Sequence, residues 1–81
     1  MNREEILEKI NEVFRDSFDR EDLVIREETT AADVEGWDSL KHLSLLEAVE
    51  DEFDMRFTMA EVSGMKNIGE MISIIAERTK G

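Results

Sequence analysis

Three side chains that could take part in a chemical reaction lie close together in this sequence: Asp38, Ser39 and His42. A serine hydroxyl acts as a nucleophile when a base activates it and a third group orients that base. A hydroxyl in the first turn of a helix can instead carry a phosphate diester, because that end of a helix favours negative charge. The spacing of the three residues decides between these two kinds of chemistry.

The catalytic interpretation fails on spacing. His42 is the single histidine of the chain and stands three residues after Ser39, so on a helix it lies on a neighbouring face. Asp38 directly precedes the serine, and three residues this close in sequence do not enclose a pocket. The Gly-x-Ser-x-Gly turn of many hydrolases is also absent. We therefore expect no catalytic residue and no enzyme activity, and we interpret His42 as a half-exposed surface residue.

The residues that follow Ser39 have the spacing of a helix. Apolar side chains recur every three or four positions, the pattern of one buried face: Leu40, Leu43, Leu46, Val49 and Phe53. Asp38 is suited to cap this segment, because its carboxylate can accept from the free amides of the first turn. We predict a helix over residues 39–53, with Ser39 in its first turn.

The N-terminal half of the chain predicts one helix and one long connection. A helix over residues 3–17, capped by Asn2, has an apolar stripe: Ile6, Leu7, Ile10, Val13, Phe14 and Phe18. Residues 19–38 show no sustained period, and so long a connection must pack side chains of its own. The candidates are Leu23, Val24, Ile25 and Val34. Thr30 and Asp33 have the spacing to cap a short helical turn.

The C-terminal part predicts two more helices. Thr58 and Glu61 have capping-box spacing, which marks a short helix over residues 59–63. Asn67 begins the same pattern again before a last helix, whose apolar face is formed by Ile68, Met71, Ile72, Ile75 and Ala76. The methionines are expected mostly as core filler, some of them lining a space that accepts a flexible apolar chain.

These elements predict an all-α fold in one domain, residues 1–81. We expect a four-helix bundle of three longer helices and one short third helix, with a long ordered loop between helices one and two. The absence of proline and the four scattered glycines agree with this fold class. The absence of cysteine excludes disulfides and thiolate metal sites.

The net charge of −11 limits the classes of partner. Nucleic acid and anionic membrane surfaces are excluded, whereas basic protein surfaces are favoured. No signal peptide or membrane-spanning stretch is evident, so we expect a cytoplasmic monomer. Carboxylates cluster late in the predicted second helix, as a solvated face or as a docking surface: Glu47, Glu50, Asp51, Glu52 and Asp54. They lack the calcium-loop pattern, so we expect no metal site.

Asp38-Ser39-Leu40, the leucine-rich segment after it, Glu50-Asp51-Glu52-Phe53 and then Phe57 resemble the acyl carrier protein family over nearly the whole chain. The resemblance implies that Ser39 carries 4′-phosphopantetheine, attached from coenzyme A by a Mg-dependent phosphopantetheinyl transferase, and that Asp38 acts near that metal or as a cap. The thiol for acyl groups must then come from the arm. Acyl-loading and acyl-processing enzymes with basic surfaces would dock on these residues: Leu40, Glu47, Glu50, Asp51 and Asp54.

Four residues depart from the pattern of fatty-acid carriers: Trp37, Lys41, Ser44 and Glu47. Lys41 and Ser44 replace usual acids near the serine, so a partner that expects acid there would be repelled. We therefore expect a specialised stand-alone carrier of fatty acid, polyketide or related biosynthesis, and a poor substrate for general fatty-acid elongation enzymes. The alternatives are a stand-alone peptidyl or aminoacyl carrier and an unmodified acidic adaptor.

Overall fold

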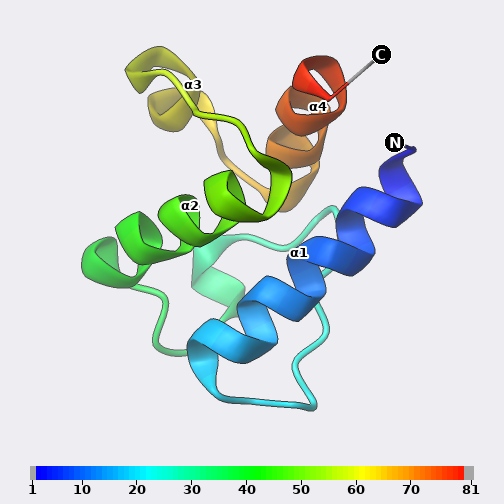
Figure 1. The fold of residues 1–81 in the computed structure, drawn as a ribbon. Helices are drawn as coiled ribbons and strands as arrows, with labels where there is room; N and C mark the ends of the chain where they lie inside the picture. Colours follow the sequence, from blue (N-terminus) through cyan, green and yellow to red (C-terminus); the bar gives the residue numbers. More distant parts are fainter. Residues whose placement is uncertain (1, 80–81) are drawn as a thin grey trace.

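The computed structural model describes residues 2–79, and these residues form helices and loops without a strand (Figure 1). The elements follow one another as α1 (Arg3–Phe18), the 3-10 turn η1 (Ala31–Asp33), α2 (Ser39–Phe53), α3 (Met59–Gly64) and α4 (Ile68–Arg78). The predicted fold class, with three longer helices and a short third one, is confirmed. None of these helices combines the length and the apolar character that crossing a membrane requires.

A polar side chain caps the first turn of each α-helix, as the sequence predicts. The capping residues are Asn2, Asp38, Thr58 and Asn67. Each of them accepts a hydrogen bond from the amide three residues later, which satisfies one free donor of the helix end. The starts of the helices are therefore encoded locally.

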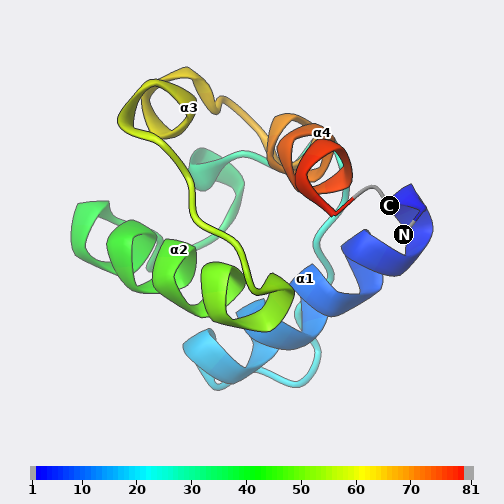
Figure 2. The ribbon, with the colours of Figure 1, turned by 45° about the horizontal axis from the view of Figure 1, so that its top comes forward.

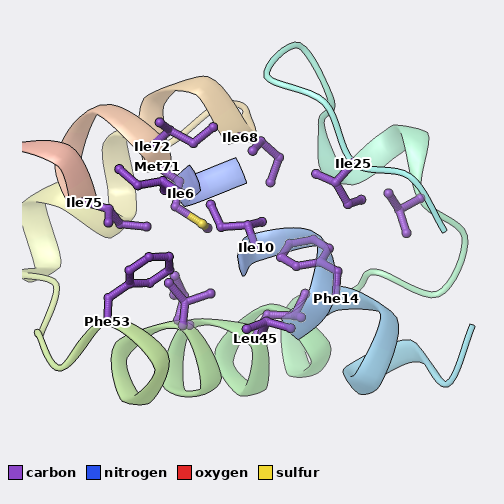
Figure 3. Close-up of a cluster of buried hydrophobic side chains, with 14 of the residues drawn as sticks. Ile6, Ile10, Phe14, Ile25, Leu45, Phe53, Ile68, Met71, Ile72 and Ile75 are labelled. Carbon is purple, nitrogen blue, oxygen red and sulfur yellow. The ribbon is translucent and has the colours of Figure 1, made fainter. Parts of the chain in front are cut away.

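The core forms where α1 crosses both α2 and α4 (Figure 2). Its most deeply buried side chains come from all three long helices and from the loop (Figure 3): Ile6, Ile10, Phe14, Ile25, Leu45, Val49, Ile68, Met71, Ile72 and Ile75. The short helix α3 has no buried residue. Within the described residues, α1 is thus the common support of the bundle.

The long loop between α1 and α2 is ordered and contributes to the core. Leu23, Ile25 and Val34 are buried, as expected. The expectation for Val24 is wrong, because this side chain is 59% exposed. Its neighbours on both sides point inward, and successive side chains of extended backbone point in opposite directions. Thr30 begins η1 through the predicted capping box.

Backbone contacts fasten this loop to the start of α4. The amide of Gly69 donates to the carbonyl of Glu27 at 2.7 Å, and the amide of Ile68 donates to that of Thr29 at 3.0 Å. A Cβ at Gly69 would lie 3.2 Å from the Glu27 carbonyl oxygen, which explains a glycine in the first turn of a helix. Hydrogen bonding to the Arg3 guanidinium lowers the pKa of the Glu27 carboxyl. The loop therefore holds α4 through its backbone, and the Arg3–Glu27 ion pair joins the same part of the loop to α1.

Polar side chains of α1 form hydrogen bonds with the backbone of the same loop. The Asn11 amide group donates to the Ile25 carbonyl at 3.0 Å, and its oxygen accepts from the Ile25 amide at 2.6 Å. Arg15 donates to the Leu23 carbonyl at 2.6 Å. These bonds satisfy buried loop backbone that has no helix or strand partner. They explain how a connection this long stays ordered and places the start of α2.

Candidate functional site

Ser39 is the first residue of α2, and its side chain is exposed. The Asp38 carboxylate accepts from the Lys41 amide at 2.8 Å, and the Asp38 carbonyl accepts from the His42 amide at 2.8 Å. These bonds leave the amides of Ser39 and Leu40 for another acceptor. A phosphate group on the Ser39 hydroxyl would lie beside free amides at the positive end of the helix.

Trp37 and His42 form a pair next to the serine. The indole Nε1–H of Trp37 donates to Nδ1 of His42 at 3.1 Å, and the two rings stack with centroids 5.8 Å apart. The edge of Trp37 also meets the Phe14 ring at 5.1 Å, which connects the pair to the buried face of α1. His42 is partly buried, close to the predicted half exposure, but its bond to Trp37 was not predicted.

Ser39 also lies at the rim of a hollow of about 450 Å³, here called the serine hollow. Its lining is mostly apolar: Ala31, Trp37, Asp38, Ser39, His42, Leu43 and Met65. A smaller hollow of about 50 Å³ shares Trp37, His42 and Met65 and reaches the core residues Ile68 and Met71. The serine is thus placed where an attached chain has apolar surface within reach.

The buried face predicted for α2 is wrong in its first two members. Leu40 is 78% exposed and Leu43 is 59% exposed, whereas Leu45, Leu46, Val49 and Phe53 are buried. At its N-terminal end, α2 projects beyond the crossing with α1, so its first turns have no helix to cover them (Figure 1). Leu43 borders the serine hollow instead, and Leu40 presents an apolar side chain beside Ser39.

The Lys41 amine is turned toward α1. Its Nζ donates to the carbonyl of Ser17 at 2.9 Å and lies 5.2 Å from the centre of the Phe18 ring. The C-terminal end of a helix favours positive charge, so this contact stabilises the charged amine. Lys41 therefore does not stand as a free cation over Ser39, which removes part of the reason for expecting repulsion of fatty-acid enzymes.

The carboxylates at the other end of α2 fall into two groups. Glu47, Asp51 and Asp54 are exposed; we call these three the acid surface. Glu50 is partly buried and accepts from the Phe57 amide at 2.8 Å, while Glu52 lies 3.6 Å from the Lys9 amine. Among the described residues, no group of three or more acidic or histidine side chains is arranged to hold a metal ion.

No protein-family model matches the chain. It is 31% identical to the acyl carrier protein of Saccharopolyspora erythraea over 74 residues, which cover 91% of this chain and 78% of that protein. It is 29% identical to the acyl carrier protein of Clostridium perfringens over 75 residues, 93% of this chain and 99% of that protein. These relatives are named as carriers and not as enzymes, in agreement with the expectation from the sequence.

A solved structure has the same arrangement of helices. The solution structure of holo acyl carrier protein from Geobacter metallireducens superposes with a TM-score of 0.82 at 31% identity, covering 88% of this chain and 82% of that one. Likeness of sequence and of fold therefore extends together over most of the chain. On this combined ground, the chain belongs to the acyl carrier protein family.

Proposed function

We propose that the protein carries acyl groups as thioesters on a 4′-phosphopantetheine arm attached to Ser39. The observation that supports this most is the position of the serine: exposed, first in α2, directly after its capping aspartate, and at the rim of an apolar hollow. Membership of a carrier family gives this position its meaning. The pathway that we propose is fatty acid, polyketide or related specialised biosynthesis.

The residues around Ser39 fit such an arm. The free amide N–H groups of Ser39 and Leu40 can donate hydrogen bonds to the phosphate oxygens, and the exposed hydroxyl is open to a transferase. In the attachment step, the Ser39 Oγ bonds to the phosphorus of coenzyme A that bears the pantetheine group. The bond from this phosphorus to the oxygen of the leaving 3′,5′-ADP breaks, and the transferase takes the serine proton. When bound, the arm supplies the thiol that this cysteine-free chain lacks. Asp38 keeps the first turn in place through its bond to the Lys41 amide.

Both ends of α2 are proposed to contact partner enzymes. We propose that Leu40, which is exposed beside the serine, contacts the transferase and the acyl-processing enzymes directly. The acid surface would attract basic patches on these enzymes. Glu50 lies in the same region, but its carboxylate accepts from the Phe57 amide and so holds the loop after α2 in place.

Modification at Ser39 is tested by intact mass. The protein is incubated with coenzyme A, Mg²⁺ and a broad-specificity phosphopantetheinyl transferase, and we expect one arm to be added. Ser39→Ala should abolish the addition completely. Ser44→Ala is the matched control, because Ser44 is an exposed serine of the same helix and should leave the addition unchanged. An unchanged mass with several transferases would favour an unmodified adaptor.

The class of cargo is tested on the modified protein. We expect malonyl or simple acyl groups to load as thioesters, which neutral hydroxylamine cleaves. Loading by an amino-acid adenylating enzyme without any acyl loading would instead assign a peptidyl or aminoacyl carrier.

A further inference from the structure

The bond between Trp37 and His42 decides which nitrogen of the histidine carries a proton. An indole N–H can only donate, so the Nδ1 of His42 that receives it must be the accepting nitrogen. A neutral imidazole has one proton, which is then on Nε2. Trp37 therefore fixes His42 as a hydrogen-bond donor through Nε2–H.

This donor has no partner within residues 2–79. No hydrogen bond of His42 Nε2 is found there, and no buried side-chain nitrogen or oxygen of the described residues lacks a partner. Nε2 is therefore accessible rather than buried. His42 lines both the serine hollow and the smaller hollow, so the accessible donor belongs to a residue of their common wall.

The rest of that wall has little polar character. Ala31, Leu43 and Met65 offer apolar surface, and the indole N–H of Trp37 is already used. The Asp38 carboxylate accepts from the Lys41 amide and adds negative charge, which disfavours an anionic occupant. An occupant that fits is uncharged, mostly apolar, and bears one hydrogen-bond acceptor. A wholly saturated occupant would cover the donor without pairing it, which costs free energy.

The occupant is a group that Ser39 itself carries. Ser39 lines the serine hollow, so a flexible chain attached to its hydroxyl starts at the rim and can fold back over the apolar wall. The hollow of about 450 Å³ is shallow and open to solvent, so a chain lying on it keeps one side in water. We propose that the Trp37–His42 pair makes the protein select acyl groups that bear a hydroxyl or carbonyl oxygen over saturated groups of equal length. This inference rests on the proposed attachment at Ser39.

The test compares two cargoes that differ in one oxygen. Octanoyl and 3-hydroxyoctanoyl phosphopantetheine are each transferred from their coenzyme A thioesters, and intact mass confirms the loading. The rate of cleavage by neutral hydroxylamine is measured and divided by the rate for the same thioester of free pantetheine. We expect the hydroxylated cargo to be protected about threefold to tenfold more than the saturated one, the effect of one hydrogen bond.

Variants separate the donor from the shape of the hollow. His42→Phe keeps a ring but removes the donor, and should make the protection of the two cargoes equal. Trp37→Phe keeps an aromatic contact with Phe14 but frees the histidine tautomer, and should reduce the preference. Met65→Ala is the control: it enlarges the hollow without touching the donor, so it should weaken the protection of both cargoes by the same factor.

A spectroscopic measurement reports on the same pair without any partner enzyme. Trp37 is the single tryptophan, and there is no tyrosine, so the intrinsic emission and the indole N–H resonance both come from this site. We expect the Trp37 and His42 resonances to shift with the hydroxylated cargo and much less with the saturated one. Equal protection of the cargoes, or a full shift already in the unloaded holo protein, would overturn the inference. A protein that takes no arm at Ser39 fails earlier, at the mass measurement, and contradicts the proposed function itself.

Discussion

The two ends of α2 are built in opposite ways. At the N-terminal end, three polar side chains have partners within the protein: Asp38 bonds the Lys41 amide, Lys41 bonds α1, and His42 bonds Trp37. The apolar side chain of Leu40 is 78% exposed there, next to the exposed Ser39. At the C-terminal end, the apolar residues Val49 and Phe53 are buried, and the acid surface faces solvent.

The difference teaches how one helix can separate attraction from fit. Charges act over a Debye length of about 8 Å at physiological salt, so the acid surface can influence a partner before contact. Apolar surface acts only when water is removed from between two surfaces. A helix rises about 1.5 Å per residue, so Asp51 is about 18 Å along the axis from Ser39. On the proposed function, the acids would guide a partner from a distance at which they do not act on the chemistry at the serine.

Of the substitutions that test this contrast, neutralising the acid surface should have the largest effect, on the rate of association with a partner. With Glu47→Gln, Asp51→Asn and Asp54→Asn together, we expect the association rate with a phosphopantetheinyl transferase to fall about tenfold at low salt. The loss should shrink as salt passes about 0.15 M, because screening already weakens the attraction. Stopped-flow binding at two salt concentrations measures both effects.

The matched control removes the same amount of charge elsewhere. Glu8, Glu21 and Glu77 are exposed and lie outside α2, and changing all three to glutamine alters the net charge equally. If this control slows association as much as the first variant, the total charge matters and the acid surface has no special part.

Removing the cap at the other end should cost stability rather than attraction. Asp38→Ala deletes the acceptor of the Lys41 amide, and we expect the free energy of unfolding to fall by about 1 kcal/mol, measured with urea. Asp38→Asn keeps an acceptor oxygen and should lose much less. Equal losses for the two variants would mean that the charge at Asp38, and not its hydrogen bond, holds the helix start.

The smallest effect, on the free energy of unfolding, is expected when the Lys41 amine is removed. Lys41→Met keeps most of the apolar stem over Phe18 and removes the amine, so the free energy of unfolding should fall by about 0.5 kcal/mol. The rate of modification at Ser39 should stay the same, because the amine lies against α1. A several-fold faster modification would show that the amine faces the partner, and would break the contrast between the two ends.

Local rules predicted the parts of this molecule that local interactions determine. The capping pairs Asp38–Lys41 and Thr58–Glu61 act within one helical turn, and both helix starts were placed correctly. The exposure of Leu40 and Leu43 depends on where α1 crosses α2, which periodicity does not contain. The Lys41–Ser17 bond joins residues 24 positions apart, so it follows only from the path of the loop.

The serine hollow shows the same limit. Trp37 and His42 are near in sequence, but their bond needs the turn at Gly36, which has a φ of 90°, and a contact with Phe14 on another helix. The sequence predicted the helix and the place of Ser39 in its first turn, and attachment at Ser39 stays a prediction. It did not predict the shape or the hydrogen-bonding character of the surface beside it, because these come from the meeting of α2, the long loop and the segment that carries Met65.

The backbone bond between Gly69 and Glu27 has a consequence for slow motions of the molecule. Because the amides at the start of α4 are satisfied by loop carbonyls, the loop cannot detach without exposing them, and both should exchange hydrogen with solvent as one cooperative unit. The helix α3 has no buried residue and is held by the packing of Val62 on the core and by the ion pair of Glu61 with Arg78, so we expect it to open at lower cost. Met65 directly follows α3 and lines the serine hollow, so we expect local opening of α3 to widen this hollow.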